Sequence, residues 1–121
     1  MGVVLITGAN RGIGLEFVRQ YAEEGIEVIA TCKRPDEAKA LILLTDKFPN
    51  LSVEKLDMNS DEDLKVLRLT LEKSDIQLDI LVSNAGAAFQ GALLDVSQDT
   101  FEKAFDLNFW GHHFMAKACV E

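Results

Sequence analysis

Short apolar runs recur at intervals along the chain and predict β-strands. Runs rich in valine, isoleucine and leucine occupy residues 2–7, 27–32, 51–56 and 79–82. The first of them reads Gly2-Val3-Val4-Leu5-Ile6-Thr7 and carries no charge, as expected of a strand that is buried on both faces of a sheet.

Segments with helical periodicity separate these runs. Ile13, Phe17 and Tyr21 are spaced four residues apart, with Val18 and Ala22 beside them, and predict a helix over residues 12–24, which Gly25 ends. Tyr21 lies on the apolar stripe of this helix, so its expected role is core packing.

Three more helices are predicted from their starting residues. Pro35, followed by two acidic residues, opens the second helix. Ser60, with Asp63 three residues on, caps the third. The fourth and longest runs from Ser97 to Glu121.

A strand followed by a helix, four times over, predicts an α/β fold with helices on both faces of a parallel sheet. The commonest such topology is the Rossmann-type doubly wound sheet, whose nucleotide-binding form has six or more strands in the order 3-2-1-4-5-6. We therefore expect one partial domain over residues 1–121, truncated to about four strands and four helices. Its fourth strand would then be an edge strand.

Composition and charge narrow the class of protein. Of the 121 residues, 48% are apolar and 26% charged, which is typical of a soluble globular domain. The net charge of −8 argues against a nucleic-acid partner. No apolar run approaches the roughly 20 residues that cross a bilayer, and the N-terminus lacks a secretory signal. With two distant cysteines and no disulfide framework, we expect a cytoplasmic protein with no membrane partner.

A glycine-rich loop joins the first strand to the first helix and reads Thr7-Gly8-Ala9-Asn10-Arg11-Gly12-Ile13-Gly14. Gly8 permits a tight turn, Gly12 lets the backbone approach a pyrophosphate, and Gly14 allows close packing of helix on strand. The amide groups at the start of the helix would attract phosphate charge. A glycine-rich turn without a ligand is the competing interpretation. The loop is not a P-loop, because no Gly-Lys-Ser/Thr follows.

Four motifs in this order resemble the short-chain dehydrogenase/reductase family. They are the Thr-Gly-x-x-x-Gly-x-Gly loop, Asp57 after the third strand, Asn84-Ala85-Gly86 after the fourth, and Asn108 within the last helix. The resemblance covers the whole chain. Residues 1–66 look most like the small carbonyl reductases of the family, and residues 83–117 are similar to sugar- or alcohol-oxidising members.

The resemblance implies roles for the residues after the third and fourth strands. Asp57 and Met58 would contact the adenine of a dinucleotide. Asn84 would bridge the central strands and line the cofactor pocket, while Ala85 and Gly86 would leave room beside the ribose. Taken alone, Asp57 could equally be a strand-end residue that caps a turn, and Asn84 an ordinary turn asparagine.

The end of the second strand favours NADP(H) over NAD(H). An acidic residue there would hold the 2′-hydroxyl of the adenosine ribose, but the strand ends with Lys33 and Arg34. These two cations, with Arg11 of the glycine loop, suit a 2′-phosphate. A solvated pair of surface cations is the competing interpretation.

The catalytic residues of the family are mostly missing. Resembled members use a tyrosine with a lysine four residues later, but the single tyrosine here, Tyr21, is followed at that spacing by Gly25. Asn108 is the one member of the family's catalytic set that is present. The adjacent His112 and His113 point in different directions around a helix and predict no metal site.

We therefore expect the NADP(H)-binding portion of a short-chain reductase, whose complete form would move hydride between the nicotinamide and a small carbonyl or alcohol substrate. The chain by itself is expected to be inactive. A non-catalytic nucleotide-binding module and a protein-interaction module remain open alternatives. We also expect a homo-oligomer through the helix from Ser97 to Glu121, because that helix carries many large apolar residues: Phe101, Phe105, Phe109, Trp110, Phe114 and Met115.

Overall fold

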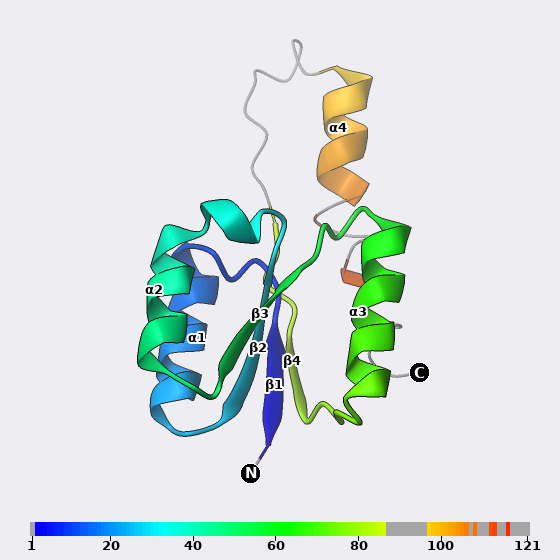
Figure 1. Ribbon diagram of the computed structural model, residues 1–121. Helices are drawn as coiled ribbons and strands as arrows, with labels where there is room; N and C mark the ends of the chain where they lie inside the picture. Colours follow the sequence, from blue (N-terminus) through cyan, green and yellow to red (C-terminus); the bar gives the residue numbers. More distant parts are fainter. Residues whose placement is uncertain (1, 87–96, 107, 109–111, 114–115, 117–121) are drawn as a thin grey trace.

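A four-stranded parallel sheet lies at the centre of the protein (Figure 1). The computed structural model describes residues 2–86, 97–106, 108, 112, 113 and 116. The strands are β1 (Val3–Ile6), β2 (Glu27–Cys32), β3 (Leu51–Lys55) and β4 (Ile80–Val82). Their order is β3-β2-β1-β4, which confirms the predicted Rossmann-type order.

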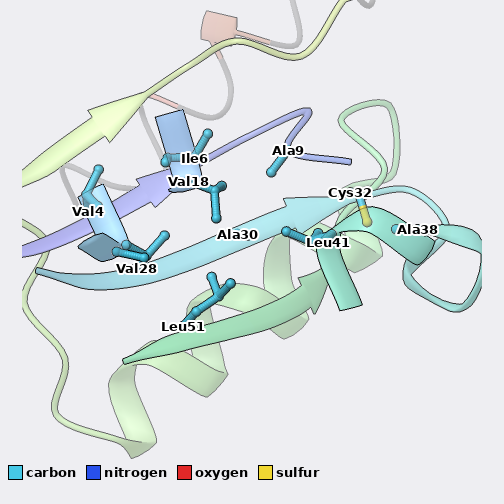
Figure 2. Packing of buried hydrophobic residues seen from close by; sticks show 11 residues of the cluster. Val4, Ile6, Ala9, Val18, Val28, Ala30, Cys32, Ala38, Leu41 and Leu51 are labelled. Atoms are coloured by element: carbon cyan, nitrogen blue, oxygen red, sulfur yellow. The ribbon is translucent and has the colours of Figure 1, made fainter. Parts of the chain in front are cut away.

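Helices cover both faces of the sheet (Figure 1). On one face lie α1 (Gly12–Glu23) and α2 (Lys39–Lys47), and on the other lies α3 (Asp61–Lys73). The hydrophobic core accordingly has two parts. Val4, Val28 and Leu41 belong to the cluster on the α1 and α2 side (Figure 2), whereas Leu5 and Leu67 belong to the cluster under α3. Successive β1 residues thus face opposite clusters, as predicted for a strand buried on both faces.

The predicted apolar stripe of α1 is buried only in part. The residues that α1 buries are Gly14, Val18 and Ala22. Of the predicted stripe, Val18 and Ala22 are therefore buried, whereas Ile13 is 71% exposed and Phe17 39% exposed. Small residues face the sheet because α1 lies close to the strands at Gly14. Tyr21 is partly buried against the core and stacks on the Phe17 ring, with the expected packing role.

The start of the second helix differs from the sequence prediction. Pro35–Glu37 form a short 3₁₀ turn, and α2 begins only at Lys39. Ala38 separates the two because its backbone, with φ −85° and ψ 68°, is not helical. The start of α3 is as predicted: the Ser60 hydroxyl accepts the Asp63 N–H at 3.1 Å.

The fourth helix, α4 (Gln98–Phe105), begins beside Ser97 as predicted and lies beyond the carboxyl ends of the strands (Figure 1). Asp106 and Asn108 continue it in a wider, π-helical winding. Phe109, Trp110, Phe114 and Met115, which the oligomer prediction invokes, lie outside the described residues.

Within the described ranges, no strand pairs with the outer edge of β4, where Ile80 is 40% exposed. No described helix is long and apolar enough to span a membrane.

Candidate cofactor-binding site

Thr7 joins the carboxyl ends of β1 and β4. Its side chain is fully buried, and its hydroxyl oxygen accepts the backbone N–H of Asn84 at 2.9 Å and of Ala85 at 3.0 Å. The N–H of Thr7 in turn donates to the Val82 carbonyl at 3.0 Å. One hydroxyl therefore fixes the turn after β4 against the turn after β1.

The first and third glycines of the loop are required by close packing. Gly8 has a φ of +62°, and a Cβ there would lie 2.7 Å from the Ala85 Cα. A Cβ on Gly14 would overlap the Gly8 carbonyl oxygen and approach the side-chain nitrogen of Asn84 to 2.7 Å. That nitrogen donates to the carbonyls of Thr7 and Gly8, at 3.4 and 3.3 Å. The asparagine thus bridges the two loops, as the family resemblance implies.

The N-terminus of α1 is open to a ligand. Gly12 has a φ of +57° and no atom within 4 Å of its Cβ position, so the loop presents bare backbone there. Arg11 precedes α1 without a side-chain cap, and the first turn of α1 holds no acidic residue. The N-terminus of α3, by contrast, has a serine cap and three acidic residues in its first turn. The positive end of the α1 dipole is therefore available to an anion.

These loops surround a pocket of about 1040 Å³ at the carboxyl ends of the strands. A pocket in this position and of this size suits a dinucleotide. Its walls come from the glycine loop, the ends of β2 and β3, the turn after β4, and α4. The lining residues are Gly8, Asn10, Arg11, Gly12, Ile13, Cys32, Lys33, Leu56, Asp57, Met58, Asn59, Asn84, Ala85, Gly86 and Lys103.

Eleven of the predicted cofactor-binding residues lie together in that lining. Thr7 and Gly14 lie behind it and support it through their contacts with Asn84, Ala85 and Gly8. Arg34 is not in the lining, and its guanidinium lies 3.7 Å from the Glu37 carboxylate instead.

The charge of the pocket is opposite to that of the chain. Among its described lining residues, Arg11, Lys33 and Lys103 are cationic and Asp57 alone is anionic, whereas the chain carries a net charge of −8. Lys33 Nζ lies 3.8 Å from Asp57 Oδ2. A cationic pocket in an acidic chain selects an anionic ligand.

Asp57, which follows β3, both caps a turn and lines the pocket. Its Oδ1 accepts the Asn59 N–H at 3.0 Å, and its carbonyl accepts the Ser60 N–H at 2.9 Å. These bonds form the capped turn that the sequence allowed. Asp57 also lines the pocket beside Met58, where the family resemblance implies an adenine contact.

Lys103 is a lining residue that the sequence analysis missed. It belongs to α4, where its ammonium group pairs with Asp99 at 3.0 Å. Its position in the sequence, five residues before Asn108 of the last motif, was the signal that could have placed it near the site. A lysine on a helix usually marks a solvated face, and only the placement of α4 brings this one to the pocket.

The remaining predicted site residue, Asn108, lies beside the turn after β4. A Cβ on Gly86 would be 3.0 Å from Asn108 Oδ1. Nearby, the Ser83 hydroxyl and His112 Nδ1 are hydrogen-bonded. No group of three His, Cys, Asp or Glu side chains able to hold a metal occurs in the part of the chain that the structure describes.

Comparison with known proteins agrees with this geometry. The short chain dehydrogenase family model matches residues 2–121. Galactitol 2-dehydrogenase from Agrobacterium fabrum is 34% identical over 96% of this chain and 44% of its own length. An NADPH-bound carbonyl reductase from chicken fatty liver superposes with a TM-score of 0.92 at 28% identity, over 99% of this chain and 47% of that one.

A further solved structure, serine dehydrogenase complexed with NADP⁺, has a TM-score of 0.85 and 31% identity, over 97% of this chain and 47% of that one. The chain thus spans less than half the length of each of these three proteins. The match over nearly every residue, the 3-2-1-4 strand order and the glycine loop agree. The chain belongs to the short-chain dehydrogenase family.

Proposed function

We propose that this chain binds NADP(H) as the cofactor-binding portion of a short-chain reductase. The observation that carries the proposal is the charge of the pocket. Three cations and one carboxylate are among its described lining residues, the N-terminus of α1 beside it has no side-chain cap, and the chain has a net charge of −8. Two of the solved relatives are described as complexes with NADPH or NADP⁺, which supports the same assignment.

Each part of the pocket has a partner on a dinucleotide. The backbone at Gly12 and Ile13 would receive the pyrophosphate. Asp57 and Met58 would contact the adenine, and Lys33 with Arg11 would bind the 2′-phosphate of the ribose. Lys33 and Arg34 directly follow β2, in the place of the acidic residue that would favour an unphosphorylated ribose.

The bound cofactor would supply a hydride at its nicotinamide. At the nicotinamide end, the protein would orient the cofactor through Asn84, whose amide bridges the loops after β1 and β4. The complete enzyme would reduce a carbonyl or oxidise an alcohol. In this chain the single tyrosine, Tyr21, packs against the core and is followed four residues later by Gly25, not by a lysine. That observation favours the second candidate, a nucleotide-binding module without turnover.

Calorimetric titration with NADPH and NADH tests the proposal. We expect NADPH to bind at least tenfold more tightly, since a charge-assisted hydrogen bond contributes about 1.5–3 kcal/mol. Equal affinities would contradict the NADP(H) assignment, and no binding of either would favour an interaction module. NADPH oxidation with a carbonyl substrate then separates an active chain from a binding module, and we expect none.

We also propose self-association through the segment from Ser97 to Glu121. Phe105 on α4 is 44% exposed and Ile80 leaves the β4 edge apolar, and such surfaces favour association. Light scattering coupled to size exclusion, at micromolar concentration, gives the mass directly. A single species at 13.4 kDa, the mass of one chain, would contradict the proposal.

A further inference from the structure

Two side-chain contacts join the segment after β4 to the helical segment that carries Asn108. Ser83 Oγ is hydrogen-bonded to His112 Nδ1. Three residues further along the strand segment, Gly86 faces Asn108 Oδ1 so closely that a Cβ would be 3.0 Å from it. Asn108 and His112 are four residues apart, a spacing that places two side chains on one face of a helix. The two contacts therefore pair residues in opposite order along the chain: the earlier Ser83 meets the later His112, and the later Gly86 meets the earlier Asn108.

Ser83 lies outside the cofactor pocket. On β4, Leu81 packs into the cluster under α3 and Val82 against the cluster under α1 and α2. Because strand side chains alternate, Ser83 points to the α3 side. The next residue, Asn84, lines the pocket. We therefore expect the hydrogen bond at Ser83 to affect a bound ligand only through the segments that it joins, and not by direct contact.

Gly86 lets the two segments approach, but a glycine has no side chain that can fix their register. The hydrogen bond between Ser83 and His112 is directional, so it can fix the register of the two segments. Lys103 belongs to α4, which precedes Asn108, and lines the same pocket as Gly86. The register of this region therefore determines where both Asn108 and Lys103 lie.

We propose that Ser83 and His112 are positioning residues, whose hydrogen bond sets the register of the Asn108 segment so that Asn108 faces Gly86 and Lys103 reaches the pocket. The importance of that register for a cofactor rests on the proposed function. The contact between the two segments does not, and it is tested separately.

The first test uses the ring nitrogens of the two histidines in a long-range ¹H–¹⁵N spectrum. Ser83→Ala should shift the Nδ1 signal of His112 and leave that of His113 in place. Ser83→Thr keeps the hydroxyl and should preserve the wild-type signal. Ser74→Ala removes a serine at the C-terminal cap of α3 and serves as the matched control. An unchanged His112 signal in Ser83→Ala would overturn the proposal.

The second test measures the register itself. In the wild type, a nuclear Overhauser effect should connect the Gly86 α-protons with the Asn108 side-chain amide, and it should weaken in Ser83→Ala and His112→Phe. His112→Asn places an amide oxygen near the former Nδ1 position and should restore it. Persistence of the full effect in His112→Phe would show that the hydrogen bond does not set the register.

The third test measures NADPH affinity. Ser83→Ala and His112→Phe should each weaken binding by about two- to tenfold, the worth of one hydrogen bond, with recovery in Ser83→Thr and His112→Asn. Affinity unchanged in both would overturn the link to the pocket. A wild-type chain that binds no NADPH would refute the proposed function, while the two spectroscopic tests still decide on the contact.

Discussion

Lys33 and Asp57 face each other across the ends of β2 and β3, with Nζ 3.8 Å from Oδ2. The lysine side chain is 64% exposed, and an ion pair so accessible to water contributes at most about 1 kcal/mol. A phosphate, with more charge and three acceptor oxygens, can compete for the same ammonium. The pair therefore keeps the lysine at the pocket mouth and leaves it available to a ligand.

Replacement of Lys33 should separate the two nicotinamide cofactors. We expect Lys33→Ala to weaken NADPH binding by about 1–3 kcal/mol and to leave NADH binding within twofold, because only NADPH carries the 2′-phosphate. Arg34→Ala tests the other predicted contact. Since Arg34 lies beside Glu37 and outside the pocket lining, its loss should be smaller. Equal weakening for both cofactors in Lys33→Ala would refute the phosphate assignment.

Removal of the Thr7 hydroxyl should destabilise the fold. Thr7→Val keeps the shape of the buried side chain but leaves the N–H groups of Asn84 and Ala85 without their acceptor. Each unsatisfied donor costs about 1–3 kcal/mol, which urea denaturation can measure. Thr7→Ser should recover most of the stability.

Thr31 offers a matched control for that experiment. It is equally buried, and its hydroxyl makes a single hydrogen bond of 3.2 Å to the Ile6 carbonyl. Thr31→Val should therefore cost less than Thr7→Val. The opposite order would show that Thr7 does not hold the two loops together.

Gly14→Ala should disrupt the start of α1. The new methyl group would overlap the Gly8 carbonyl and crowd Asn84, so helix and strand must separate, at a cost of about 1–3 kcal/mol or more. Gly25→Ala is the comparison: its φ of +80° makes it strained, but no atom lies within 4 Å of the new methyl. Loss of NADPH binding is expected in Gly14→Ala alone, and binding retained at wild-type affinity there would contradict this packing.

Burial raises the pKa of the Cys32 thiol, which is 3% exposed at the end of β2. In a Cys119→Ser background, the folded chain should react slowly with a thiol reagent and the urea-unfolded chain rapidly.

The raised pKa of Cys32 also gives the direction in which stability changes with pH. A folded-state pKa above the unfolded value contributes stability at lower pH, and that contribution is lost as pH rises above about 8.5. Cys32→Ala should lack this decline, and an identical alkaline decline in both proteins would exclude the thiol as its source.

Local sequence patterns predicted the strands, their order and the glycine-rich loop. These features depend on local patterns. Apolar runs such as 2–7 are typical of strands buried inside a sheet. Gly8 and Gly14 stand where backbone crowding leaves no room for a side chain. The Ser60 cap was predictable for the same reason, because its partner Asp63 is three residues away. Right-handed crossovers then left few arrangements of the strands.

Which residues meet at the pocket depends on long-range packing. Lys103 reaches it although 70 residues separate it from Lys33, whereas Arg34, adjacent to Lys33, turns to Glu37. The exposure of Ile13 and Phe17, and the bond between Ser83 and His112, likewise follow from how helices pack on the sheet. Periodicity predicts which residues share a face of a helix. It does not predict which strand, helix or pocket lies against that face, because long-range packing decides this contact.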